Sequence, residues 1–520
     1  MTPEPAVSLS RPSLPPWPPS GSISEFFGEK SEAIFHGAAK HGMMKKRSNE
    51  QKPMMKRVNE KNKPEEDLEE ISSSFRDPSG HLFKKDGVLF RSVLKSYSRH
   101  YDLAKESGLY ESLIKDGLLI SHEEVSADFE LSSATYKILK PKMISFISYP
   151  YEWSFSQLKD AALLTLEIQK HALRKGMTLK DASAYNISFD GARPVFIDTL
   201  SFEKYEEGLP WVAYRQFCQH FLAPLALMSY KDLRLSFLFR LFIDGLPLDL
   251  ASSLLPRRTM FNLRLASHIH LHAKGQKKYS EEAPRRVKVS RIGLQALVGS
   301  LQKSVEKLAL KRQKTEWQDY YDRTNYSPES FAEKKEIVSE FLRLVSPRSV
   351  WDLGANTGLF SRIASSRGIP TTSFDIDPIA VEQNYLQSKK RGEENLLPLV
   401  LDLANPSPSL GWAGEERMSL EKRGPTDVLL ALALVHHLSI SNNLPFQKIA
   451  EYFSRLGGNL IIEFVPKSDS QVRRLLRTRK DIFTDYDEES FEKEFGEYYQ
   501  IQSKERISGS ERILYLMRKK

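Results

Sequence analysis

The chain has 520 residues, which is too long for a single hydrophobic core and predicts two globular domains with less structured segments. The net charge of +9 is compatible with an anionic partner, but no run of Lys and Arg interleaved with aromatic residues marks a nucleic-acid surface. The single cysteine, Cys218, excludes an intrachain disulfide, a cysteine zinc site and an iron–sulfur cluster.

The cellular location follows from the same features. A single cysteine fits a reducing compartment, and the N-terminus has no apolar signal-peptide core. The most apolar stretch, residues 217–242, is interrupted by His, Lys, Asp and Arg, so it reads as core helices. We therefore expect no membrane span and a cytoplasmic protein.

Composition divides the chain into four parts. Residues 1–72 are Pro-rich and then Lys-rich with few periodic apolar residues, which predicts a disordered tail. Residues 73–272 read as an α+β domain. Residues 273–316 read as a basic connector with one helix near Leu294 to Leu310, and residues 317–520 as a second globular domain.

Local patterns predict elements of the first domain. Residues 80–91 read as a strand, an Asp-Gly turn and a second strand, and residues 109–115 as a short helix. The apolar spacing from Ser156 to Arg174 predicts a long amphipathic helix, with Ser154 as its N-cap and Gly176 as its C-cap.

The second domain opens with a buried strand that runs into a glycine-rich turn at residues 349–358. Gly354 and Gly358 have no Cβ, so the backbone can approach a ligand closely. Asn356 occupies the middle position, and Asn tolerates the left-handed conformation better than most residues. A helix is expected over residues 359–366.

Acids and histidines follow the next strands. The strand at 371–374 ends in Asp375, roughly 20 residues after the last glycine, which is the place of an acid that accepts bonds from ribose hydroxyls. The third strand, 399–402, ends in Asp402, and the fourth, 427–434, precedes His436 and His437. A fifth strand is expected over 459–464. Ligands bind at the carboxyl ends of such strands, where these residues fall.

This ordered set resembles the class I S-adenosylmethionine-dependent methyltransferases. The family pattern Asp-x-Gly-x-Gly-x-Gly appears here with Asn356 at its central position. The resemblance implies that the loop holds the methionine part of the cofactor, Asp375 the ribose and Asp402 the adenine edge; a helix N-cap is the alternative role for Asp402. The implied S-adenosyl-L-methionine site comprises Asp352, Gly354, Asn356, Gly358, Asp375 and Asp402.

Methyl transfer needs a base only where the acceptor must lose a proton. His436 or His437 is a candidate for that catalytic role, and the alternative is that one packs and the other caps a helix. An aromatic group before the first strand either covers the cofactor pocket or packs a helix on the sheet. It comprises Trp317, Tyr320, Tyr321 and Tyr326.

The first domain contains a second polar group. A hairpin predicted around Asp190-Gly191 brings Asn186 and Asp198 together, with Asp181 nearby, and such donors suit Mg²⁺ and phosphate. The spacing is similar to the catalytic loop and metal hairpin of the protein-kinase-like fold, which implies an Mg²⁺ and ATP site. His-Arg-Asp and Asp-Phe-Gly are not matched, and no Gly-rich loop or Val-Ala-Ile-Lys strand is found upstream. A degenerate binding module and a plain polar hairpin therefore stay open.

The predicted fold class is α/β: a Rossmann-like class I methyltransferase domain with a parallel-rich sheet, preceded by an α+β kinase-like domain and a disordered N-terminal tail. The whole architecture resembles bacterial nodulation-protein-like methyltransferases, which implies a glycan or small-molecule acceptor rather than protein or RNA. The alternatives are a bifunctional methyltransferase and phosphotransferase, and a non-catalytic interaction protein on a cofactor-binding scaffold.

Overall fold

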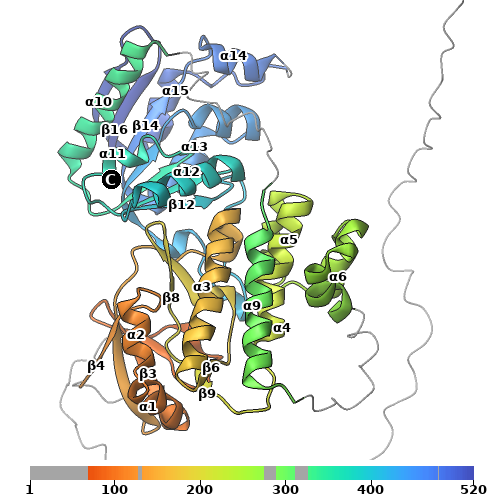
Figure 1. Cartoon of the computed structure of the whole chain (residues 1–520). Helices are drawn as coiled ribbons and strands as arrows, with labels where there is room; N and C mark the ends of the chain where they lie inside the picture. The colour runs from red at the N-terminus through yellow and green to blue at the C-terminus, as the bar shows by residue number, and fades with distance from the viewer. Residues whose placement is uncertain (1–67, 127–131, 274–287, 311–325, 478–479) are drawn as a thin grey trace, which may run out of the picture. The chain divides into compact units, whose positions relative to one another are not determined.

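The structure is a computed structural model that describes residues 68–126, 132–273, 288–310, 326–477 and 480–520 (Figure 1). The predicted tail therefore lies outside the described residues up to position 67. Its boundary at residue 72 is wrong, because β1 (Leu68–Glu70) already pairs antiparallel with β2 (Leu82–Lys85). A three-residue, fully exposed strand has no apolar alternation from which sequence could predict it.

An antiparallel sheet opens the described chain, with strand order β1-β2-β3-β5-β4. The predicted strand, turn and strand are confirmed: Asp86 and Gly87 have φ of 52° and 77° and join β2 to β3. The predicted short helix is α2, which follows α1 in the link between β3 and β4. The bounds are β3 (Val88–Leu94), α1 (Ser98–Glu106), α2 (Leu109–Lys115), β4 (His122–Val125) and β5 (Thr135–Pro141).

The predicted long helix is α3 (Phe155–Arg174). The Ser154 Oγ accepts from the Gln157 N–H, which confirms the N-cap. The C-cap is Lys175 rather than Gly176, because Gly176 is the left-handed residue that follows the cap, with φ of 73°. Four short strands follow, in which β6 pairs with β9 and β7 with β8. Their bounds are β6 (Met177–Leu179), β7 (Ile187–Asp190), β8 (Arg193–Phe196) and β9 (Phe202–Lys204).

A helical layer completes the first domain. The helix expected inside a connector is α9, and it packs against α3 with buried Leu294, Val298 and Leu301. Lys159 on α3 donates to the Leu308 carbonyl at 2.8 Å, so this helix is part of the domain rather than a free connector. The bounds are α4 (Tyr214–Phe217), α5 (Ala223–Tyr230), α6 (Leu248–Leu254), α7 (Leu263–Leu265) and α9 (Arg291–Lys307).

The second domain contains a seven-stranded sheet with order β12-β11-β10-β13-β14-β16-β15 (Figure 1). The first five strands in this order pair in parallel, while β16 is antiparallel to both β14 and β15. The parallel-rich sheet predicted from the sequence is thereby confirmed. The bounds are β10 (Val350–Leu353), β11 (Thr371–Asp375), β12 (Leu396–Val400), β13 (Thr426–Ala431), β14 (Gly457–Phe464), β15 (Tyr499–Arg506) and β16 (Ile513–Lys519).

Both faces of this sheet are buried. Val350, Leu430 and Ile461 face a core that α10 and α11 complete, and their sequence neighbours Trp351 and Leu429 face the other core. None of the described helices is long and apolar enough to span a bilayer. The helices are α10 (Pro328–Val345), α11 (Ser361–Ser365), α12 (Pro378–Arg391), α13 (Phe446–Leu456), α14 (Ser470–Leu476) and α15 (Glu488–Gly496).

Candidate functional site

The glycine-rich turn lies at the carboxyl end of β10, in the middle of the parallel strands. Gly354, Asn356 and Gly358 have φ of 76°, 51° and 77°, so each adopts the left-handed conformation that the sequence anticipates. A Cβ added to Gly358 would lie 2.5 Å from the Asn384 side chain. Gly358 thus allows the turn to pack closely against α12.

Asp375 closes this turn against the next strand. Its carboxylate accepts from the Asn356 N–H at 2.7 Å and from the Asp377 N–H at 2.8 Å. Asp352 is 2% exposed and accepts from the Ser361 Oγ at 2.5 Å. The end of β11 and the turn after β10 therefore form one continuous polar edge.

The carboxyl groups of Asp352 and Asp375 both have a pKa close to neutral pH. Burial raises the pKa of Asp352 to about 7, with a further upward contribution from Asp375, and burial raises the pKa of Asp375 to about 6. Among the described residues neither acid has a cation within ion-pair distance. Buried acids without a paired cation suit a ligand that carries positive charge and hydroxyl donors, and S-adenosylmethionine has both.

Asp402 lies two residues beyond β12, and its carboxylate accepts from the Ala404 N–H at 2.9 Å. This bond is of the kind that a helix N-cap makes, which was the alternative role for Asp402 in the sequence analysis. It leaves the second carboxylate oxygen able to accept from other donors. Asp402 therefore lies beside Asp375 at the sheet edge, since the Leu401 N–H donates to the Asp375 carbonyl at 2.8 Å.

A buried charge cluster at the end of β14 was not assigned a role from sequence. Glu463 is fully buried; it accepts from Lys334 at 2.6 Å and from the Ala433 N–H at 2.7 Å, and its side chain also bonds Tyr326. Burial alone raises the pKa of Glu463, but Lys334 and Arg512 outweigh it and lower that pKa to about 2. The position of Glu463 near the end of a predicted strand was a sequence signal for a functional role. Nothing in the sequence indicated that Lys334 or Arg512 would pair with it.

The histidines follow β13 after a turn through Ala433, whose φ is 49°. His436 is 1% exposed and its Nδ1 has no hydrogen-bond partner, while the two imidazole rings lie 4.2 Å apart. Burial lowers the pKa of His436 well below its ordinary value and, with Arg512, lowers that of His437 to about 4. Both rings are therefore neutral at pH 7. Of the aromatic group, Tyr326 contacts Glu463, and Trp317, Tyr320 and Tyr321 lie outside the described residues.

The polar group of the first domain lies around the hairpin formed by β7 and β8. The hairpin pairs Ile187 with Phe196, and the Asn186 Nδ2 donates to the Ser201 Oγ at 3.3 Å, while Ser201 bonds Asp198. Burial and the charge of Asp198 both raise the pKa of Asp181, which places these two acids close together.

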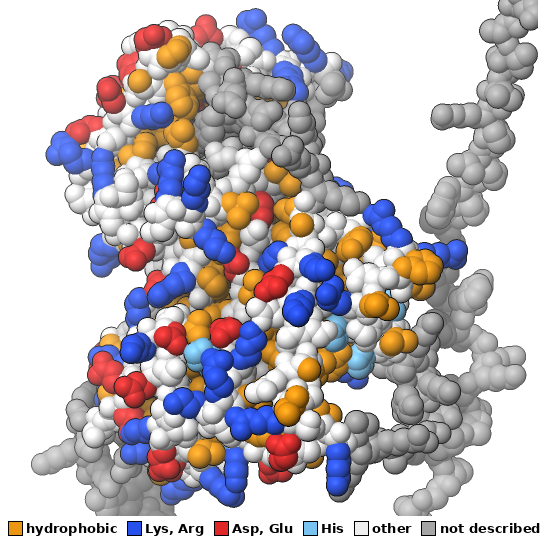
Figure 2. Space-filling view, in the orientation of Figure 1, with side chains coloured by type: hydrophobic (Ala, Val, Ile, Leu, Met, Phe, Trp, Pro, Cys, Tyr) orange, Lys and Arg blue, Asp and Glu red, His pale blue; other side chains and the backbone are white. Residues whose placement is uncertain are grey.

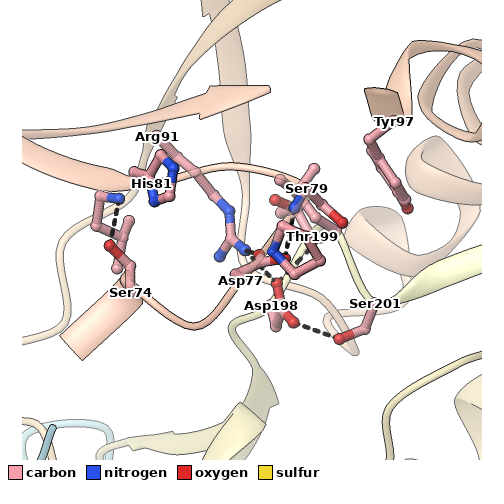
Figure 3. A network of polar contacts seen from close by, with 12 residues as sticks. Ser74, Asp77, Ser79, His81, Arg91, Tyr97, Asp198, Thr199 and Ser201 are labelled. Atoms are coloured by element: carbon pink, nitrogen blue, oxygen red, sulfur yellow. Dashed lines mark hydrogen bonds and ion pairs between the residues drawn. The ribbon is translucent and has the colours of Figure 1, made fainter. Parts of the chain in front are cut away.

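Arg91 is the residue of this group that sequence reasoning missed. Its guanidinium lies 2.8 Å from Asp198 and 2.5 Å from Asp77 (Figure 3). Lys180 donates to the Ser79 Oγ at 2.6 Å beside them. The described residues contain no group of three or more His, Cys, Asp or Glu arranged to hold a metal. Arg91 ends the predicted range 80–91 and lies in the middle of β3 only in the structure, so the sequence carried no signal for its role.

Residues 402–425, which we call the bridging segment, form part of the contact between the two domains; α12 forms another part, where Tyr385 and Lys389 donate to Asp160 at 2.7 and 2.6 Å. Arg423 binds Glu152 through bonds of 2.6 and 2.8 Å, and both side chains are almost completely buried. The Ser407 Oγ donates to the same carboxylate at 2.5 Å, and the Met418 N–H donates to the Tyr149 hydroxyl at 2.9 Å. The segment that begins with Asp402 is therefore held by the first domain.

The bridging segment also reaches the polar group of the first domain. The Arg417 guanidinium lies 4.2 Å from the ring centre of Tyr185, the neighbour of Asn186. Arg76, the neighbour of Asp77, forms an ion pair of 2.6 Å with Glu416. One segment thus begins at Asp402 and contacts sequence neighbours of the first domain's polar group.

The strand order and the glycine turn define the second domain as a Rossmann-like α/β domain of the class I methyltransferase type. The chain is 36% identical over 455 residues to nodulation protein NoeA of Rhizobium meliloti (strain 1021), covering 86% of this chain and 95% of that protein. The chain therefore belongs to the family of nodulation protein NoeA. No protein-family model matches it.

Two solved structures show lower similarity. N-methyltransferase NodS from Bradyrhizobium japonicum WM9 is 10% identical with a TM-score of 0.27, covering 37% of this chain and 98% of that one. The bifunctional kinase-methyltransferase WbdD is 15% identical with a TM-score of 0.26, covering 36% of this chain and 39% of that one.

Proposed function

We propose that the chain is an S-adenosylmethionine-dependent methyltransferase whose active site lies at the carboxyl edge of β10, β11, β12 and β13. The observation that carries this proposal is the bond to Asp375 from the N–H of Asn356, which lies between two glycines in the left-handed conformation. It joins a ligand-approachable backbone turn to a buried acid at the position of a ribose acceptor.

Each residue then has a defined task. The turn from Asp352 to Gly358 holds the methionine part, Asp375 accepts from the ribose hydroxyls and Asp402 contacts the adenine edge. The bound cofactor supplies an activated methyl group, so positioning of the acceptor provides much of the acceleration. His437 or His436 accepts the acceptor's proton where one must leave; both rings are neutral at pH 7, and the lowered pKa makes each a weaker base than a free imidazole.

Calorimetry of the full chain with S-adenosylmethionine tests the cofactor site. We expect binding, and Asp375→Ala should weaken it by about 1.5–3 kcal/mol because a charge-assisted bond to the ribose is lost. Asp427→Ala is the matched control, since Asp427 begins β13 at the opposite edge and pairs with Arg348. A folded chain that binds no cofactor at millimolar concentration contradicts the proposal, and equal affinities for both variants contradict the role of Asp375.

For the acceptor we propose a glycan or another small molecule, on the basis of the resemblance to nodulation-protein-like methyltransferases. Transfer of a labelled methyl group to separate glycan, protein and RNA pools is the test. Incorporation into protein or RNA alone would contradict this class. Cofactor binding without transfer to any pool would favour the non-catalytic scaffold.

For the first domain we propose a kinase-like module that has lost phosphotransfer and presents the acceptor. Support comes from the helices between β3 and β4, the β6–β9 pair and the hairpin before Asp198. The specific observation against phosphotransfer is Arg91, which takes the place beside Asp198 that a metal ion would need. Calorimetry with Mg²⁺–ATP decides: tight binding that is lost in Asp198→Ala would favour the bifunctional enzyme instead.

A further inference from the structure

The segment from Leu250 to Ala273 presents an apolar tip on its surface. Phe261 is 88% exposed and Leu263 85%, and Leu271 and Met260 are 60% and 47% exposed. They lie on η7 (Arg257–Phe261), on α7 and on the helical continuation through η8 (Ala266–His270). Hydrophobic side chains gather over this α6 region beside Lys and Arg (Figure 2). Single exposed apolar residues are ordinary, but four within one short segment are not.

The outward direction of these side chains is imposed by the buried side of the same segment. Leu265 and Ile269 are almost completely buried and form part of the core. His270 is held between the Ser252 Oγ at 2.7 Å and the Thr259 Oγ1 at 2.9 Å, which ties η8 to α6 and to η7. Because the inner face of the segment is held in this way, Phe261 and Leu263 point away from the core.

Charge indicates what the tip contacts. The described segment from Leu250 to Ala273 contains Arg257, Arg258 and Arg264 and no acidic residue. Thr259 alone separates Arg257 and Arg258 from Met260 and Phe261. Neither arginine forms an ion pair among the described residues, and the Arg258 guanidinium lies 5.8 Å from the ring centre of Tyr230. A phenylalanine and leucines at the tip of a helical segment, with arginines beside them, match the pattern of interfacial insertion into an anionic lipid surface.

We propose that this tip, residues 254–271, attaches the protein peripherally to an anionic lipid surface. Phe261 and Leu263 enter the boundary between headgroups and acyl chains, and Arg257 and Arg258 contact the lipid phosphates. Attachment of this kind uses only the side chains described above and is independent of the methyltransferase assignment. A second copy of the chain or another protein on the same tip are the competing occupants.

Sedimentation of the full chain with vesicles tests the proposal. We expect binding to vesicles of one part phosphatidylglycerol to two parts phosphatidylcholine and little binding to phosphatidylcholine alone. The double variant Phe261→Ser/Leu263→Ser should lower partitioning by about tenfold or more, since two large apolar side chains are removed. Leu344→Ser is the matched control, because Leu344 on α10 is 57% exposed and lies in the other domain.

A second pair of variants tests the charge. Arg257→Gln/Arg258→Gln should lower binding to the anionic vesicles by about fivefold for each charge, and Lys390→Gln should leave it unchanged. Thermal melting should be the same for every variant, because the altered side chains are exposed. Absent vesicle binding, or equal binding by the Phe261→Ser/Leu263→Ser variant, overturns the proposal. Concentration-dependent self-association that this variant abolishes overturns it in favour of a second copy.

Discussion

Removal of Arg423 is expected to be among the most damaging single changes to this protein outside the cofactor turn. Its guanidinium forms two bonds to Glu152, donates to the Ile147 carbonyl at 2.8 Å and lies 4.7 Å from the ring centre of Phe146. The side chains of Arg423 and Glu152 are 2% and 0% exposed. Arg423→Met keeps most of the hydrocarbon contact but leaves a carboxylate in the domain interface without its cation.

The size of the effect follows from what stays behind. Glu152 would keep bonds from Ser407 and from the Tyr149 N–H, which satisfy part of its charge. Breaking one partner of a buried pair costs about 3–5 kcal/mol. For a cooperative unit of about 200 residues this lowers the melting temperature by roughly 6–20 °C. The double variant Glu152→Leu/Arg423→Met should recover at least half of the loss, because no unpaired charge remains.

Thermal melting of the single and double variants measures this coupling. The control is Arg343→Met, which breaks an ion pair of 2.6 Å to Glu340 on the surface of α10. That pair is well exposed, so its loss should leave the melting temperature almost unchanged. If Arg423→Met melts within a degree or two of the control, the reasoning that the bridging segment is locked to the first domain is refuted.

Three further predictions concern the two polar sites. Gly358→Ala should abolish cofactor binding in calorimetry because its Cβ meets Asn384, whereas Gly368→Ala, with φ of 79° and open space, should only lower the melting temperature slightly. A cationic cofactor binds ionised acids more tightly, so its affinity should rise as the pH rises through 6 and 7, where Asp375 and then Asp352 lose their protons, and should level off above pH 7. Asp352→Asn should flatten this pH profile. A flat profile for the native chain would exclude a link between cofactor binding and the ionisation of these acids. We expect Arg91→Ala to bind Mg²⁺ in calorimetry and the native chain not to bind it, and Mg²⁺ binding by the native chain would contradict the reasoning that Arg91 takes the place of a metal ion.

The local patterns that sequence predicted best are those whose cause is itself local. The left-handed positions at Gly354 and Gly358 follow from the missing Cβ, and the Ser154 cap follows from a hydroxyl beside the first turn of α3. The Asp190-Gly191 turn likewise predicted the register that brings Asn186 toward Asp198. Strand ends were less certain, as β13 stops at Ala431 rather than at Leu434.

What sequence missed depends on partners distant in the chain. Arg91 and Asp198 are joined only when β3 meets the end of the hairpin, and Lys334 reaches Glu463 only when α10 packs on the sheet. A lone Arg or Lys on an amphipathic element carries no sign of its partner, because solvent is its usual neighbour.

The sequence by itself determined the glycine turn, the acid at Asp375 and the alternation of strands and helices, since each depends on backbone freedom and on the period of apolar residues. Only the tertiary structure decided that α9 belongs to the first domain, that Arg91 stands beside Asp198 and that Glu152 and Arg423 lock the two domains. The physical reason is that burial turns ordinary charged residues into obligate pairs, and burial is a property of the packed chain.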